Sequence, residues 1–354
     1  MLLACHVFGR IWSRKSPFRV TVLAQGLQFS KMPEFPPELL NEIIGYLWND
    51  IPSLKACSLA HPTMTFPSQK RLFYSICLRA PRKRLNNSRL VRNEISGTSY
   101  DFWRLLVGSP HIAEYVQSLF VIIDYSPNYY RLLLDRDVYS SDDDQTESGL
   151  PNEGYELANG EPVGSALVRC VAKKTANPAR RIYHDKYLLR CALLLHDVKA
   201  FILNYNFILN YNDGWQYLSS KIHITLLHLM RLPSLLYVQL ESNYPSALFN
   251  VAIGDNVKHL VLCGYPQTAK LFVLPRHPSS GPLYVDSLDI RHPSLFMDRH
   301  FEDPNCRIQT SRLRKLVVIA DTYDSHATVW TILQTCHETL EDFEFTPCEE
   351  GESQ

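Results

Sequence analysis

Residues 235–262 read LLYVQLESNYPSALFNVAIGDNVKHLVL and contain one spacing of apolar residues twice. Two residues separate the first apolar residue from the second, and one residue separates the second from the third. This triad occurs at Leu235-Val238-Leu240 and again at Val257-Leu260-Leu262. The second and third positions are two residues apart, which places both side chains on the same face of a β-strand. Each copy therefore predicts a short strand with one buried face.

The same triad recurs along most of the chain. The other copies are Phe73-Ile76-Leu78, Val116-Leu119-Val121, Val198-Phe201-Leu203, Val285-Leu288-Ile290, Leu313-Leu316-Val318 and Leu340-Phe343-Phe345. Five consecutive triads begin at residues 235, 257, 285, 313 and 340, so the intervals are 22, 28, 28 and 27 residues. These intervals lie in or near the roughly 20–29 residues that are typical of leucine-rich repeats. The spacing therefore indicates a stacked array of similar units.

Amphipathic stretches lie between the predicted strands. Residues 220–232 and 326–337 carry apolar side chains at helical spacing, and residues 101–107 form a shorter case. An alternation of strand, loop and helix is what a solenoid requires, because each unit buries its apolar face against its neighbours. The sequence therefore predicts an α/β fold in which an irregular leucine-rich-repeat solenoid occupies residues 81–348.

Polar residues follow several triads at the position where leucine-rich repeats carry asparagine or cysteine. A buried amide at this position satisfies backbone groups of the loop. Asn206, Asn243 and Cys348 stand three residues after their triads, and Asp124 and Asp321 hold the position in two other units. The remaining units lack a suitable residue, so the predicted array is irregular.

A different pattern precedes the array, and residues 35–80 are predicted to form three short helices. Pro36 and Pro37 suit the first turn of a helix, where a missing N–H removes no hydrogen bond. Ser53 is expected to cap a second helix that ends near Ala60, and the third helical piece reaches Tyr74.

The first of these helices has more apolar residues than a helix with one buried face needs. Its two adjacent rows at i, i+4 spacing are Leu39-Ile43-Leu47 and Leu40-Ile44-Trp48. Together they exceed the roughly 100° stripe of a one-sided helix. A unit of about 45 residues buries only a small share of its own surface. The second side is therefore expected to be covered either by the downstream array or by a partner protein.

Two segments are expected to lie outside the folded units. Residues 135–161 carry nine acids against Arg136 alone, which predicts a disordered acidic insertion. Residues 1–31 carry five basic residues and no acid, a composition that mitochondrial presequences share. Because a complete domain follows directly after Met32, we interpret residues 1–32 as a disordered or mis-assigned extension. Residues 33–80 are then the helical domain.

Residues 35–78 resemble an F-box. The matching features are Pro36-Pro37-Glu38-Leu39, Ile43-Ile44, Leu47, Leu54-Lys55-Ala56-Cys57-Ser58-Leu59 and Arg71-Leu72-Phe73. Met64 stands where this family usually has Trp, and Met can fill the same gap. The whole chain looks like the F-box-like proteins that are expanded in mushroom-forming fungi, and residues 109–116, SPHIAEYV, look like the first repeat of that group.

The resemblance implies that the F-box docks on the Skp-type adaptor of a cullin-based SCF ubiquitin ligase, while the repeats hold a substrate protein. It implies no cofactor and no catalytic residue in this chain, and a location in the cytoplasm, the nucleus or both. The side chains expected to contact the adaptor are Pro37, Leu39, Ile43, Ile44, Leu47, Leu54 and Leu59. The alternative is an interaction scaffold without a link to ubiquitin ligation, whose F-box packs only on its own repeats.

Signatures of common enzymes are absent, because the chain has no GxSxG, GxxxxGKS/T or GxGxxG motif. Cys57 and His61 lie four residues apart, as two zinc ligands on one helix face would, but no second pair lies nearby. We therefore favour a buried thiol beside an exposed histidine. His196 and Asp197 could begin a proton relay, although such a pair at a strand edge is more often structural. A hydrolase hidden in the array would need a pocket with convergent polar groups.

Bulk composition limits the partners. The chain has 36 basic and 36 acidic residues, which argues against a protein that binds nucleic acid over a uniformly basic surface. It has no apolar run long enough to span a membrane. Basic clusters at residues 79–92 and 173–181 could contact an acidic partner or an import receptor, and we favour solvated loops instead. Nine cysteines without a CxxC pair indicate reduced, buried thiols.

Overall fold

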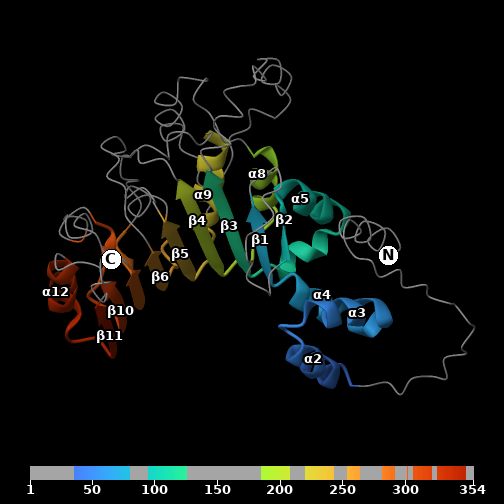
Figure 1. Cartoon of the computed structure of the whole chain (residues 1–354), viewed down its shortest axis with the longest axis horizontal. Coiled ribbons are helices and arrows are strands. Elements are labelled where there is room, and N and C mark those ends of the chain that lie inside the picture. Colours follow the sequence, from blue (N-terminus) through green and yellow to red (C-terminus); the bar gives the residue numbers. More distant parts are fainter. Residues whose placement is uncertain are drawn as a thin grey trace, which may run out of the picture.

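The computed structural model describes residues 36–79, 95–125, 185–207, 220–242, 253–263, 281–291, 301, 306–320 and 325–347. In these residues the protein has a mixed α/β structure around one long parallel sheet (Figure 1). The predicted α/β class is therefore confirmed. The proposed extension at residues 1–32 and the acidic insertion at residues 135–161 lie outside the described residues.

Nine strands form this sheet, in the order β11-β10-β8-β6-β5-β4-β3-β1-β2, and all neighbours are parallel. Apart from β2 at one edge, the order in space follows the order along the chain, as it does in stacked supersecondary units. The strands are β1 Ser75–Arg79, β2 Ile95–Thr98, β3 Ser118–Tyr125, β4 Ala200–Phe207, β5 Tyr237–Ser242, β6 His259–Cys263, β8 Ser287–Arg291, β10 Lys315–Ala320 and β11 Asp342–Pro347. A separate pair consists of β7 Leu283–Tyr284 and β9 Ile308–Gln309.

The register of the sheet aligns the apolar triads. The second triad residue of one unit pairs with the second of the next, as Val238 pairs with Leu260 and Leu260 with Leu288. The same alignment runs from Ile76 in β1 to Phe343 in β11. These side chains are buried except for Phe343, which is half exposed because no described strand follows β11. The strand positions predicted from the triads are confirmed in every unit.

A backbone hydrogen-bond motif repeats with the triads. The carbonyl after the first triad residue accepts two N–H groups from the next unit, as Leu236 O does from Lys258 and His259 at 2.8 and 3.0 Å. The acceptors are the carbonyls of Tyr74, Gln117, Lys199, Leu236, Lys258, Asp286 and Arg314. Each unit therefore enters its strand with the same backbone geometry, although most of the side chains between the triads differ.

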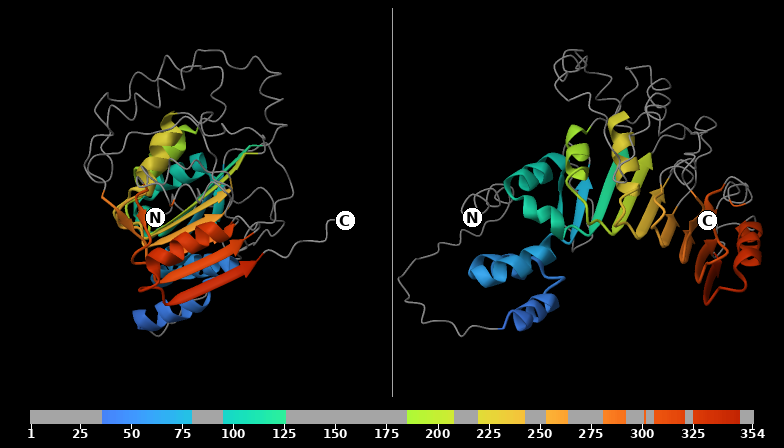
Figure 2. Two further views of the ribbon diagram at one scale, coloured as in Figure 1. Left: turned by 90° about the vertical axis from the view of Figure 1, so that its left-hand side faces the viewer. Right: turned by 180° about the vertical axis from the view of Figure 1, so that it is seen from behind.

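The helices of the array pack on the face of the sheet that carries the triads (Figure 2). They are α5 Ser99–Gly108, the 3-10 helix η1 Pro110–Tyr115, α8 Lys186–Ala192, α9 Ser220–Met230 and α12 Ser325–Cys336. The helices predicted at residues 101–107, 220–232 and 326–337 are confirmed as α5, α9 and α12. Helices α8 and η1 were not predicted, because 7 and 6 residues are too few to give a clear helical period.

Helix α8 begins at a buried carboxylate. Asp185 accepts the backbone N–H groups of Tyr187 and Leu188 at 3.0 and 3.1 Å and so caps α8. Its other oxygen accepts the hydroxyl proton of Ser99 at 2.6 Å. Because Ser99 is the first residue of α5, one side chain starts a helix and also ties it to its neighbour.

We expect Asp185→Ala to lower the free energy of unfolding by about 2 kcal/mol, since it removes a helix cap and leaves the buried Ser99 hydroxyl without its acceptor. Urea unfolding followed by the fluorescence of Trp103, whose ring lies 5.2 Å from that of Tyr187, would measure the change. The control is Asp50→Ala, which removes an exposed cap and should have about half the effect. Equal losses in the two variants would contradict a special role for Asp185.

A buried guanidinium joins three connections near the C-terminal half of the sheet. The Nε and Nη1 atoms of Arg307 donate to the carbonyls of Gly281 and Ile253, both at 3.0 Å. Its Nη2 atom forms an ion pair with the exposed carboxylate of Asp255. Ile253 and Asp255 lie before β6, and Gly281 lies before β7. Arg307 itself directly precedes β9, so it holds the entries of these three strands together.

Within the part of the chain that the structure describes, two strands reach the predicted polar position after the triads. Asn206 in β4 pairs in register with Asp124 in β3, so both strands extend to this position. The side chains of these two residues, and all of Asn243, Asp321 and Cys348, lie outside the described part of the chain. The role of these polar residues stays a prediction.

Candidate protein-binding surfaces

Three helices precede the sheet where the sequence predicts them. They are α2 Pro37–Tyr46, α3 Ile51–Ala60 and α4 Pro62–Leu72. We call them the helical unit; it lies beside the β1 end of the sheet (Figure 1). Only Phe73 and Tyr74 separate α4 from β1. The predicted domain boundary at residue 80 therefore falls after the first strand of the sheet and not before it.

Side chains cap the second and third helices of this unit. The Asp50 carboxylate accepts the N–H of Ser53 at 3.1 Å, so Asp50 caps α3, and the predicted cap at Ser53 is wrong. The helix starts earlier because Pro52 fits into its first turn, where no N–H is needed. The hydroxyl of Ser53 donates back to Asp50 at 2.5 Å. His61 accepts the N–H of Thr63 and caps α4.

Helix α2 is apolar on two sides, and the described residues cover only one of them. Leu40 and Ile44 point into the core and are buried. Leu39, Ile43 and Tyr46 stand at i, i+4 and i+7 and are 47%, 52% and 79% exposed. Residues at this spacing lie on one helix face. The second side of α2 is therefore an exposed apolar stripe.

The residues expected to contact an adaptor divide into two groups. The exposed ones are Pro37, Leu39, Ile43 and Leu59. Leu47 is half-buried, whereas Ile44 and Leu54 are only 2% and 1% exposed and belong to the core. Ile44 and Leu54 are thus unavailable for direct contact, because an apolar side chain in a short helix can equally well hold its own unit together. Met64 packs against the same core, in keeping with the gap-filling role expected of it.

The helical unit is joined to the array by packed side chains. The ring of Phe66 in α4 meets the ring of Tyr115 in η1 edge-on, with 5.4 Å between the centroids. The Oε1 atom of Gln69 lies 3.4 Å from the Nε2 atom of His111, which belongs to the same 3-10 helix. Phe73 is buried in a core that continues from the helical unit into the array. The helical unit, which carries the exposed stripe of α2, is therefore fixed to the array by packed side chains.

The face of the sheet that points away from the helices of the array, which we call the outer face, carries a polar cluster. Tyr237 donates a hydrogen bond to Gln239 at 2.5 Å, and the Gln239 amide donates to Glu241 at 2.6 Å along β5. From β4, the Asn204 amide donates to the second oxygen of Glu241 at 2.6 Å. Each side chain holds the next, so the cluster is fixed before any partner binds.

The polar cluster extends into β6 and β8. Cys263 pairs in register with Arg291, which forms an ion pair of 2.8 Å with Asp289. Burial raises the pKa of the Cys263 thiol to about 11, and burial also raises the pKa of Tyr237, with the Asp289 carboxylate adding to both shifts. Near neutral pH the thiol and the phenol therefore keep their protons. The cluster supplies hydrogen bonds and charge, and no nucleophile.

Apolar side chains flank the cluster on the outer face. Phe120 and Ile202 lie on β3 and β4, and Val317 and Ile319 lie on β10, and all four are partly exposed. A polar group of fixed geometry between apolar areas is typical of surfaces that bind proteins. The outer face is therefore the second candidate surface.

The other side chains weighed for chemistry do not assemble into a reactive site. Cys57 is partly buried and His61 serves as a helix cap. Among the described residues, no group of three or more His, Cys, Asp or Glu side chains could hold a metal ion. None of the six described cysteines forms a disulfide, and four of them are buried. In the part of the chain that the structure describes, no helix is long and apolar enough to cross a membrane.

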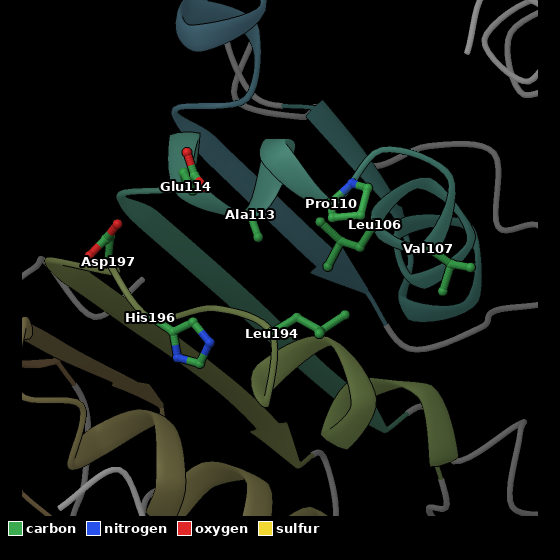
Figure 3. A pocket seen from close by; sticks show the side chains of 8 residues that line it. All are labelled: Leu106, Val107, Pro110, Ala113, Glu114, Leu194, His196 and Asp197. Carbon is green, nitrogen blue, oxygen red and sulfur yellow. The ribbon is translucent and has the colours of Figure 1, made fainter. Parts of the chain in front are cut away.

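One pocket of about 330 Å³ lies on the helix side of the sheet, between α5, η1 and the connection from α8 to β4 (Figure 3). It contains the predicted pair His196 and Asp197, together with Glu114 of η1. In Figure 3 the imidazole and the two carboxylates point in different directions. No hydrogen bond among the described residues joins the three side chains, so the pair does not form the start of a relay here.

A buried imidazole lies beneath this region. His228 of α9 is buried, and this burial lowers its pKa, although a hydrogen bond to the Ala192 backbone acts in the opposite direction. Nearby His196 lowers the pKa further. The neutral imidazole is therefore the form that the folded chain accommodates.

We expect the free energy of unfolding to fall as the pH drops below about 6.5, the ordinary pKa of histidine. The unfolded chain then binds a proton that folded His228 resists, so stability is present above this pH and is lost below it, at up to about 1.4 kcal/mol per pH unit. Urea titrations between pH 7.5 and 5 would measure the slope. His228→Gln should reduce it, whereas His337→Gln, at an exposed position, should not. An unchanged slope in His228→Gln would contradict this assignment.

No protein-family model matches this chain, and neither the curated proteins nor the solved structures include one that is significantly similar to it. A proposal for the function of this chain therefore rests on its sequence and its geometry.

Proposed function

We propose that this chain is a substrate-recognition adaptor of an SCF-type ubiquitin ligase. In this proposal the helical unit is an F-box that docks on a Skp-type adaptor. The strands from β1 to β11 and their helices form an irregular leucine-rich-repeat solenoid that holds a substrate protein. Support for a solenoid comes from the chain-ordered parallel strands, the aligned triads and the repeated backbone motif.

The exposed stripe of α2 is the observation on which docking rests. Leu39 and Ile43 are about half exposed and Tyr46 is 79% exposed on a short helix. Full burial of an aliphatic side chain is worth roughly 1.5–3 kcal/mol, so a partner that covers this stripe gains several kcal/mol. Trp48 and Leu59, which are 62% and 72% exposed, add apolar surface to the same unit. Exposed apolar surface of this kind on one small unit is typical of a site that binds a partner, and this supports the proposal.

The outer face supplies the surface for a substrate. Asn204 and Gln239 already hold the Glu241 carboxylate, so little side-chain entropy is lost when a partner binds. The apolar flanks on β3, β4 and β10 supply area for hydrophobic contact. The two surfaces lie on different elements, so one chain could hold an adaptor and a substrate at once.

The mechanism needs no reacting group in this chain. Holding a substrate lysine near a charged conjugating enzyme raises its effective concentration and converts an encounter into an intramolecular step. A rigid join between the docking unit and the capture surface makes this effect larger, because it fixes the geometry. The contact between Phe66 and Tyr115 and the continuous core supply that rigidity.

Co-purification of the intact chain with a Skp-type adaptor tests the proposal. The two proteins are expressed together, and the complex is isolated by size exclusion at physiological salt. The expected result is a stoichiometric complex, and affinity purification from cells followed by mass spectrometry should return the adaptor and the cullin together. A folded chain that fails to bind the adaptor would overturn the proposal and leave an interaction scaffold without a ligase link.

A further inference from the structure

The pocket on the helix side of the sheet has an apolar part that is open to solvent. Leu106 of α5 forms the buried part of the pocket wall, while Val107 and Leu194 are 59% and 40% exposed. Pro110 and Ala113 of η1 complete this part. The apolar surface comes from two segments about 90 residues apart in the chain, so the pocket forms only when α5 and the segment after α8 are side by side. Among the described residues, no phenylalanine, tyrosine or tryptophan side chain lines it.

The other end of the pocket is acidic. Glu114 and Asp197 are exposed, and Figure 3 places both carboxylates at the same end, away from Leu106 and Val107. Within the described residues, neither carboxylate forms an ion pair, and no basic residue other than His196 lines the pocket. A ligand that fills the pocket therefore meets aliphatic side chains at one end and two negative charges at the other.

The size of the pocket limits what can fill it. A volume of about 330 Å³ is at the lower end of the roughly 300–1,000 Å³ that ligand pockets occupy. Such a volume suits one or two side chains of a peptide better than a large cofactor. The aliphatic wall favours an aliphatic side chain, and the two carboxylates at the other end favour a cation next to it.

We propose that this pocket binds a partner peptide in which an aliphatic residue is followed directly by lysine or arginine. The aliphatic side chain lies between Leu106, Val107 and Leu194, and the cation lies between Glu114 and Asp197. The site is on the opposite side of the sheet from the outer face and does not involve α2. It therefore gives the chain a separate contact, which does not depend on adaptor docking.

Photo-crosslinking of the intact chain tests this site even if binding is weak. The probe is a short glycine–serine peptide with one photo-leucine followed by two lysines. Mass spectrometry of the digested product should place the crosslinks in residues 106–113 and at Leu194. An unlabelled Leu-Lys-Lys peptide should compete for labelling, whereas Ala-Lys-Lys should not. Labelling spread over the helical unit or the outer face would overturn the proposal.

Charge variants separate the two halves of the site. Glu114→Gln with Asp197→Asn should reduce labelling about five-fold or more at low salt, because two exposed attractions are lost. The matched control is Glu338→Gln with Glu341→Gln, which removes two exposed carboxylates elsewhere and should leave labelling unchanged. A probe with two glutamates in place of the lysines should label weakly. Equal labelling by the acidic probe, or no effect of the pocket variants, would show that charge does not select the ligand. Since no adaptor is present, either result is independent of the proposed F-box.

Discussion

Leu39→Asp together with Ile43→Asp should weaken binding of the Skp-type adaptor at least about 100-fold, because two carboxylates would be carried into an apolar contact. Both side chains are about half exposed, so the variant should fold normally. We expect an unchanged circular dichroism spectrum and a melting temperature within a few degrees of the parent, as is usual for exposed positions. Isothermal titration calorimetry with the purified adaptor would measure the loss.

Two further variants make this test specific. Trp330→Asp changes an apolar residue that is 63% exposed on α12 and should leave adaptor binding intact. Ile44→Asp would also abolish binding, but for another reason, since Ile44 is in the core and an unpaired buried charge would unfold the helical unit. Normal binding by the Leu39 and Ile43 double variant would remove α2 from the docking surface. Equal loss in Trp330→Asp would show that the effect is general and not local.

Arg307→Leu should lower the free energy of unfolding by about 3 kcal/mol, which corresponds to a melting temperature roughly 6–12 °C lower. Leucine fills part of the space but leaves the carbonyls of Gly281 and Ile253 without the guanidinium that donates to them. Ile253 is buried, so water cannot readily replace the hydrogen bond that its carbonyl loses, and the variant is destabilised. Urea unfolding of the parent and the variant would give the difference, provided that the free energy of unfolding depends equally steeply on urea concentration in both.

Matched controls separate burial from charge in this prediction. Arg314→Leu removes an arginine that is 68% exposed and should change the free energy of unfolding by less than about 0.5 kcal/mol. Asp255→Asn removes the charge that faces Arg307 from a carboxylate that is 67% exposed, and its effect should also be small. If Arg307→Leu were as mild as Arg314→Leu, the three connections would be held by other contacts.

The triads were predictable because the signal is local. Each triad residue is close in sequence to the other elements of its own unit, as in Val238-Leu240 and Leu260-Leu262. Each of these side chains must point into the core for its unit to be stable. The same residues then meet in register in β5 and β6. A buried face that repeats with the period of a strand is visible in the order of residues, and no knowledge of distant contacts is needed.

The ties between units were not predictable in this way. Asp185 and Ser99 are 86 residues apart, and Arg307 reaches Ile253 across 54 residues. Nothing near Asp185 or Arg307 in the sequence distinguishes them from surface charges. The pocket formed by α5 and the segment after α8 depends in the same way on two distant segments. Such sites become visible only when the stacking of the units is known.

From the order of its residues alone, this chain is an α/β protein with recurring strands, preceded by a unit whose first helix is apolar on two sides. The order of residues also determines that Leu39 and Ile43 share one side of that helix, because helical spacing is a local property. It does not determine that this side faces water while Ile44 faces the core. That choice, and with it which surface a partner can reach, is made by tertiary packing, since burial depends on what the rest of the chain brings against each side.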